Sequence, residues 1–288
     1  MLSYLHVDVF APHAYAGNSL PVFLNGAGLN PDQMQAITRE LRHFEAIFLE
    51  AEADAGTYRA RVFDLVEELP FAGHPIIGAA AALHETAERE EDQQWTFSLA
   101  DRSVTVITQR TGSGYFGMLD QGPARVFGEM AASDEIAAAF GLNFADLDPT
   151  LPLAIISTGL RYLIVPVRPQ VLARARIRAD ISGLLAAMGA QFAVLFDRAA
   201  CEIRHWNNDG ILEDIATGSA AGTIGAYCLR YCGARSGEAF TLNQGRFAGR
   251  PSELIVAPHG TADNINSVKV GGEVAIVGHG AIVAPPQA

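Results

Sequence analysis

The sequence is poor in positive charge, and above all in lysine. Its 288 residues contain 20 Lys and Arg against 32 Asp and Glu, a formal net charge of −12 with a pI near 5.0. This balance argues against nucleic acid or an anionic membrane surface as a partner, although a small anionic metabolite responds only to local potential. The single lysine, Lys269, falls in an expected strand, which makes a Schiff-base enzyme using pyridoxal phosphate improbable.

Cysteine is also scarce. An odd and sparse set of three residues, Cys201, Cys228 and Cys232, predicts reduced thiols and no disulfide framework. Cys228 and Cys232 stand four residues apart on an expected helix, but no further Cys or His pair completes a metal-binding set. Zinc signatures and a P-loop are absent as well. We therefore expect buried core thiols and no metal site.

Long hydrophobic runs are missing too. The small-residue and apolar stretch 76–83 ends at His84 and is too short to span a membrane. The N-terminal MLSYLHVDVF lacks the basic region of a signal peptide and has the pattern of a strand. The expectation is a cytoplasmic protein.

What the sequence does contain is a long internal repeat. Motif residues recur at almost half the chain length of 288 residues: Gly17 with Gly159 at an offset of 142, and Glu68 and Gly73 with Glu213 and Gly218 at an offset of 145. Strand, helix and glycine signals follow in the same order in both halves. The spacing predicts two homologous domains with the same topology, residues 1–121 and 122–272.

Each half contains a glycine-bearing helix start, at Gly73-His74-Pro75 and at Gly218-Ser219. Pro75 suits the first turn of a helix, and unpaired N–H groups with a positive dipole end make such a turn suitable for an anion. We expect the two helix starts to face each other across a cleft and to hold a carboxylate. The alternative is that His74, Asp214 and Ser219 simply cap their helices.

Such a site needs a proton-transfer group, and Glu45 is the strongest candidate. It is flanked by apolar residues in Arg42-His-Phe-Glu-Ala-Ile-Phe48. A carboxyl group in apolar surroundings has a raised pKa and suits proton transfer near neutral pH. The alternative is a solvent-facing strand glutamate. Glu68 and Glu213 are expected to brace the turns before the two helices.

These motifs, in this order and spacing, resemble the phenazine-biosynthesis PhzF family, over nearly the whole chain. The resemblance is carried by five segments and a closing strand: Asp8-Val-Phe10 with Gly17-Asn18; Arg39-Glu-Leu-Arg-His-Phe-Glu45; Glu68-Leu-Pro-Phe-Ala-Gly-His74; Glu213-Asp-Ile-Ala-Thr-Gly-Ser-Ala-Ala-Gly222; Gln244-Gly-Arg-Phe-Ala-Gly-Arg-Pro-Ser252; and Val270-Gly-Gly272.

The resemblance implies an α+β protein of the diaminopimelate epimerase-like fold. It would have two pseudo-symmetric domains, each a β-barrel-like sheet around a central helix, with a C-terminal strand at about 273–288 returning to the first domain. It also implies a homodimer that needs no cofactor. The roles it implies are Glu45 as the catalytic acid/base, and substrate binding by these residues: Gly73, His74, Asp214, Gly218 and Ser219.

Two departures narrow the chemistry. The epimerase branch of this fold uses one cysteine in each helix-start motif, but Ala72 and Thr217 occupy those positions here, which excludes two-thiol racemisation. Phe44 and Trp206 replace residues that are usual in the family and are expected to shape the pocket, so the sequence does not name the substrate.

The sequence therefore predicts a cofactor-independent isomerase that moves a proton within a small carboxylate-bearing metabolite. Isomerisation of trans-2,3-dihydro-3-hydroxyanthranilate, the family's reference reaction, is the leading specific possibility. Two alternatives stay open: a binding or scaffold protein without turnover, and a lyase or cyclase on the same scaffold.

Overall fold

The computed structural model describes residues 1–286, and these form two compact units. Unit 1 comprises Met1–Asp120 together with the chain from Gly271 onward, and unit 2 comprises Gln121–Val270. The last strand, β17 (Ile265–Ile282), therefore contributes residues to both units. Residues 287–288, the end of the segment expected to return to the first domain, lie outside the described residues. Among the described residues, no helix is long and apolar enough to cross a membrane.

Unit 1 alternates strands with two helices. Besides the end of β17, its elements are β1 (Leu2–Val9), β2 (Asn18–Phe23), α1 (Pro31–Leu41), β3 (Glu45–Ala51), β4 (Thr57–Asp64), β5 (Glu68–Leu69), α2 (Gly73–Ala87), β6 (Gln93–Ser98), β7 (Ser103–Arg110) and β8 (Tyr115–Asp120).

Eight strands of unit 1 close into a barrel. Going round it, β17 pairs with β1, β1 with β2, β2 with β3, β3 with β4, β4 with β6, β6 with β7, and β7 with β8. A pairing of β8 with β17 completes the ring. The β2–β3 and β4–β6 pairs are parallel, so each needs a crossover, and helices α1 and α2 lie in these connections. Closure leaves the sheet without an exposed edge.

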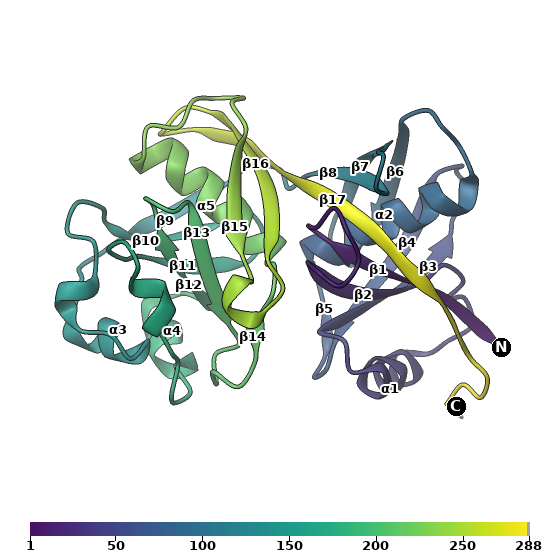
Figure 1. Ribbon diagram of the computed structural model, residues 1–288, viewed down its shortest axis with the longest axis horizontal. Coiled ribbons are helices and arrows are strands. Elements are labelled where there is room, and N and C mark those ends of the chain that lie inside the picture. Colours follow the sequence, from purple (N-terminus) through teal and green to yellow (C-terminus); the bar gives the residue numbers. More distant parts are fainter. Residues whose placement is uncertain (287–288) are drawn as a thin grey trace. The chain divides into compact units, whose positions relative to one another are not determined.

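Helix α2 occupies the inside of this barrel (Figure 1). Every residue from Gly73 to His84 is buried, which is the pattern of a helix enclosed on all sides. Small residues let the helix lie close to the strands. At Gly78 an added Cβ would come within 2.6 Å of Leu20 Cδ2 and 2.9 Å of Val9 Cγ2, so only glycine fits at this crossing.

Unit 2 repeats this plan with additions at its start. Its elements are β9 (Arg125–Met130), α3 (Asp134–Ala139), η1 (Phe144–Asp146), β10 (Leu153–Ser157), β11 (Arg161–Pro166), η2 (Val171–Arg174), α4 (Ser182–Met188), β12 (Phe192–Asp197), β13 (Glu202–Trp206), β14 (Glu213–Asp214), α5 (Gly218–Tyr231), β15 (Phe240–Gln244), η3 (Arg246–Ala248) and β16 (Ser252–Gly260), followed by the first part of β17.

The strand pairings of unit 2 follow the same order as those of unit 1. β9 pairs with β10, β10 with β11, β11 with β12 in parallel, β12 with β13, β13 with β15 in parallel, and β15 with β16. A tight turn joins β16 to β17, with reciprocal backbone hydrogen bonds of 2.9 and 3.2 Å between Thr261 and Asn264. Helix α5, buried from Gly218 to Leu229, corresponds to α2.

Each unit has its own apolar core outside the central helix. In unit 1, Phe23, Phe48 and Phe63 pack against α1 residues Met34 and Ile37. In unit 2 a larger cluster gathers under α3, η2 and α4, and it includes Trp206, which is only 5% exposed. Trp206 was expected to shape the substrate pocket. The structure places it in this core, with the Arg204 guanidinium 4.5 Å from its ring, and its role in shaping a pocket stays a prediction.

Candidate active site

A carboxyl group and an imidazole meet inside unit 1. Glu45 is the first residue of β3 and His74 the second residue of α2, and they are 6% and 3% exposed. Glu45 Oε2 lies 3.5 Å from His74 Nδ1. The alternative, a glutamate that faces solvent from a strand edge, is therefore excluded. A pair this close can share one proton, which either the carboxyl or the imidazole carries.

Asn18 adds a third polar side chain to this pair. It is the first residue of β2, it is 1% exposed, and its Nδ2 lies 3.4 Å from His74 Nδ1. The contact orients the imidazole ring on the side that faces Glu45. Sequence analysis did not assign Asn18 to the site, although it belongs to the Gly17-Asn18 motif. The signal that could have found it is a polar residue directly after a glycine at φ 66°, where the chain turns into a buried strand.

The two central helices begin without a side-chain cap, as α4 also does, whereas α1 and α3 have one. Helices α1 and α3 have side-chain caps, Asn30 accepting from Gln33 N and Ser133 accepting from Ile136 N. Helices α2 and α5 have no side-chain cap hydrogen bond and no acidic residue in the first turn. Their first-turn N–H groups and positive dipole ends are therefore not neutralised by the helix's own side chains. The idea that His74 or Ser219 caps its helix is wrong.

Asp214, in β14, is held by a buried polar network in unit 2. The Thr217 hydroxyl donates to Asp214 Oδ2 at 2.6 Å. Gln244 Nε2 donates to Asp214 O at 2.8 Å and to Thr217 Oγ1 at 2.9 Å, while Gln244 Oε1 accepts from Thr217 N at 2.8 Å. One amide side chain thus fixes both ends of the turn that leads into α5. Sequence analysis quoted Gln244 only as the start of a motif.

Ser219 and Gly218 are also fixed from neighbouring elements of unit 2. Ser219 Oγ forms a 2.8 Å hydrogen bond with the hydroxyl of Tyr162, on β11. Gln121 Nε2 donates to Gly218 O at 2.8 Å, and Gln121 Oε1 accepts from Thr158 at 2.7 Å. Side chains from neighbouring segments therefore hold the first turn of α5 in place.

Glu68 and Glu213 have structural partners, as expected. Glu68 receives two hydrogen bonds from Arg61, at 2.8 and 2.6 Å, and Glu213 receives two from Arg204, at 2.7 and 2.6 Å. Both are bidentate pairs that brace the strand before a central helix. Since Arg61 and Arg204 occupy equivalent strands, β4 and β13, they also align the two units residue by residue.

This alignment shows that only unit 1 has a carboxyl group at the position of Glu45. Arg61 pairs with Phe48 in the β3–β4 ladder, and Arg204 pairs with Leu195 in the β12–β13 ladder. Glu45 lies three residues before Phe48, and Phe192 lies three residues before Leu195. Phe192 therefore occupies in unit 2 the position that Glu45 occupies in unit 1. The Phe192 ring packs against Tyr162, with 5.5 Å between ring centroids. The two equivalent positions therefore hold one carboxyl group, that of Glu45, and not a pair of carboxyl groups.

The positions that hold cysteines in two-thiol epimerases are the N-caps of the two central helices. Ala72 precedes α2 and Thr217 precedes α5. All three cysteines lie elsewhere in unit 2: Cys201 in the turn before β13, Cys228 near the end of α5, and Cys232 at its C-cap. Neither helix start has a thiol.

His205, on β13 of unit 2, is a buried neutral base. Its Nδ1 contacts Ala193 O at 2.8 Å, and its ring lies 5.4 Å from that of Tyr162. Burial lowers the pKa of His205 below its ordinary value of 6.5, and the charges of Asp214 and Glu213 only partly oppose this.

We therefore expect unit 2 to lose stability in mild acid. The unfolded chain takes up a proton at His205 near pH 6.5 and the folded chain does not, so stability falls as pH decreases below about 6.5, by up to about 1.4 kcal/mol per pH unit. Urea unfolding at pH 7 and pH 5.5 measures this. His205→Gln should show a shallower pH dependence than the wild type, whereas the control His13→Gln, at an exposed site, should not. Equal slopes in all three proteins would contradict the assignment.

The comparisons with known proteins show which family the chain belongs to. The family model described as phenazine biosynthesis-like protein, PhzC-PhzF, matches residues 7–280. The trans-2,3-dihydro-3-hydroxyanthranilate isomerase of Pseudomonas chlororaphis is 30% identical over 293 residues, covering 98% of this chain and 100% of the relative. A structure described as a predicted epimerase from Pseudomonas aeruginosa is 44% identical with a TM-score of 0.93, covering 99% of this chain and 100% of that one.

A more distant likeness concerns the fold alone. A hydroxyproline epimerase from Agrobacterium vitis superposes with a TM-score of 0.66 at 14% identity, covering 97% of this chain and 91% of that one. Together with the strand order of the two units, this confirms the α+β, diaminopimelate epimerase-like fold that the motifs implied. The relatives confirm an isomerase and remove the scaffold alternative. The chain belongs to the phenazine biosynthesis-like (PhzF) family and is a PhzF-like isomerase.

Proposed function

We propose that this isomerase transfers a proton within a small carboxylate-bearing metabolite, with Glu45 as the group that removes and returns it. The observation that carries the proposal is the buried Glu45–His74 pair, 3.5 Å apart, beside a helix start without a side-chain cap. A buried carboxyl in contact with one imidazole is suited to exchange a proton in either direction. The developing negative charge would be stabilised by the first-turn N–H groups of α2, starting at Gly73.

The remaining site residues are assigned to binding. His74, held by Asn18, would orient the substrate and share the proton of Glu45. Asp214, Gly218 and Ser219 are proposed to bind the substrate's polar groups. Their positions support this role, because Gln244 and Tyr162 fix them at the start of the second central helix. A preorganised polar site costs little rearrangement when charge develops.

The proposed first substrate is trans-2,3-dihydro-3-hydroxyanthranilate, which the Pseudomonas chlororaphis relative is named for. It carries the carboxylate that uncapped helix N–H groups would bind. Phe44, the partly buried residue before Glu45, is the place where this chain's substrate preference would diverge.

Isomerisation of protiated substrate in D₂O tests the proposal. Because one enclosed carboxyl group takes the proton from one carbon and delivers it to another, part of the product should retain the substrate's hydrogen at the receiving carbon. Mass spectrometry of the earliest product measures this, with product incubated alone in D₂O as the control for spontaneous exchange. Complete deuteration from the first turnover would contradict a single enclosed carrier, and absence of turnover would reject this substrate.

A further inference from the structure

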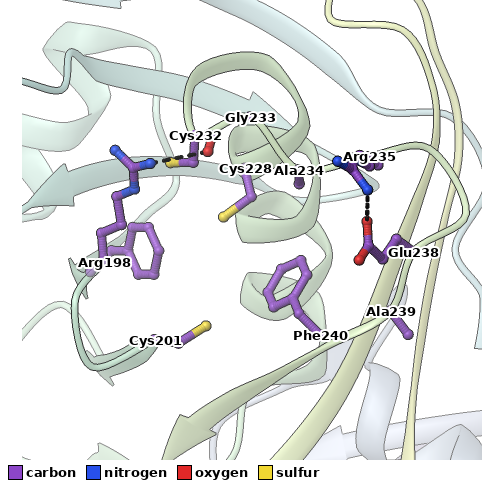
Figure 2. A pocket seen from close by; sticks show the side chains of 11 residues that line it. Arg198, Cys201, Cys228, Cys232, Gly233, Ala234, Arg235, Glu238, Ala239 and Phe240 are labelled. Carbon is purple, nitrogen blue, oxygen red and sulfur yellow. Dashed lines mark hydrogen bonds and ion pairs between the residues drawn. The ribbon is translucent and has the colours of Figure 1, made fainter.

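Most arginine side chains of unit 2 are held by oxygen atoms of the chain itself. Figure 2 shows two of them at a cavity of about 520 Å³ that all three cysteines line. Arg198 Nη2 donates to Cys232 O at 3.1 Å, and Arg235 Nη1 lies 4.0 Å from Glu238 Oε2. Contacts of this kind already give a guanidinium group an acceptor within the protein.

Arg125 and Arg161 contact an aromatic ring instead. Over residues 1–286, neither guanidinium group forms an ion pair or a hydrogen bond. Both lie over the ring of Phe127, with the guanidinium carbons 4.7 and 4.3 Å from the ring centroid. All three side chains are exposed. A guanidinium group that contacts a ring through its flat face keeps the N–H groups around its edge available for an acceptor.

Strand register brings the two arginines into one row with a serine. Arg125 is the first residue of β9, Arg161 is the first residue of β11, and Ser157, the last residue of β10, pairs with both. Directly paired residues of antiparallel strands point to the same face of a sheet, so the three side chains stand side by side. A β-bulge in the β9–β10 ladder leaves Phe127 without a directly paired residue, and its ring lies against both arginines.

The serine hydroxyl adds a third donor to this row. Gly159 N donates to Ser157 Oγ at 3.0 Å, so the hydroxyl proton remains for an acceptor outside the chain. The row is also separate from the residues assigned to the isomerase reaction. Tyr162, the neighbour of Arg161 on β11, points to the opposite face of the sheet, where its hydroxyl lies 2.8 Å from Ser219 Oγ.

We propose that Arg125, Ser157 and Arg161 bind the phosphoryl group of a small phosphorylated metabolite. Two like charges on one ring repel each other, and a dianion that contacts both removes this repulsion. A phosphate monoester carries a charge of about −1.5 to −2 at neutral pH and three acceptor oxygens, which matches two guanidinium groups and one hydroxyl. A carboxylate has one charge and two oxygens. The formal net charge of −12 disfavours long polyanions, which would meet the rest of the surface as well.

Titration of the full-length protein with methyl phosphate tests the proposal. Binding is followed by phosphorus NMR at pH 7.5 and constant ionic strength, with dimethyl phosphate as the matched probe. Methyl phosphate has two ionisable oxygens and dimethyl phosphate has one, so the first should bind saturably and the second much more weakly. Absence of saturable binding of methyl phosphate, or equal binding of the two esters, would overturn the proposal.

Single variants locate the site. Arg125→Gln and Arg161→Gln should each weaken binding of methyl phosphate by about tenfold, because each removes a charged hydrogen-bond donor. Phe127→Leu should weaken it too, since both arginines lose the ring that holds them. The control is Arg178→Gln, which removes the same charge from an exposed arginine of unit 2 and should keep wild-type affinity. Wild-type affinity in Arg125→Gln or Arg161→Gln, or an equal loss in Arg178→Gln, would overturn the proposal.

Discussion

Glu45→Gln is expected to lower kcat by about 10²- to 10⁴-fold, the range typical of a general acid–base group. Glutamine keeps the volume of the side chain and a hydrogen-bonding oxygen, but it has no proton to exchange. It also leaves the first turn of α2 unchanged, so a substrate-like anion should bind with an affinity close to that of the wild type. Steady-state kinetics and titration with a non-reactive carboxylate analogue measure the two effects separately.

Glu50→Gln is the matched control for this variant. Glu50 lies on the same strand, β3, but its side chain is exposed. The same chemical change there should leave kcat within about twofold, because surface substitutions away from a site have little effect. If Glu45→Gln retained wild-type turnover with an accepted substrate, the assignment of Glu45 would be wrong and the proton would have to move through His74 or Asp214.

Arg204→Ala is expected to lower the free energy of unfolding by about 3–5 kcal/mol, the cost of leaving one partner of a buried ion pair without the other. The Arg204 side chain is 3% exposed, and that of Glu213 is 15% exposed. Arg204 also donates to Ala175 O at 3.2 Å and stacks on the Trp206 ring at 4.5 Å. Its removal therefore leaves a partly buried carboxylate, carbonyl groups and an aromatic face without their partner.

The repeat supplies the control, since Arg61 makes the equivalent bidentate pair in unit 1. That pair is more open to solvent, with side chains 20% and 39% exposed for Arg61 and Glu68. Exposed pairs contribute about 0–1 kcal/mol, so Arg61→Ala should cost far less than Arg204→Ala. Urea unfolding monitored by tryptophan fluorescence and circular dichroism measures both. Equal losses in the two variants would show that burial does not set the strength of these pairs.

The sequence was sufficient to predict the elements that carry strong local signals. Helix α2 was predicted from Gly-His-Pro followed by small residues, and the offset of 145 residues then located α5 and its neighbours. Strand β9 and helix α3 were not anticipated. β9 alternates between partly buried and exposed residues without large apolar side chains at each inward position, so its periodicity is weak.

The motifs named candidate site residues but not the contacts between them, and the roles of these residues stay predictions. Asn18 and His74 are 56 residues apart, and only the closed barrel brings them together. The equivalence of Glu45 with Phe192 depends on strand register, which no motif spacing reveals. The homodimer, and the arrangement of the two helix starts about a common cleft, stay predictions.

The shared strand β17 has a consequence for how the chain folds during synthesis. The residues paired with β1, Val274 to Ile282, are made more than 260 residues after their partners. β1 therefore lacks this neighbour until the end of β17 has been made, whereas Gln121–Val270 is contiguous and can complete its own pairings earlier. A nascent or prematurely terminated chain therefore presents the open edge of β1, a template for intermolecular pairing.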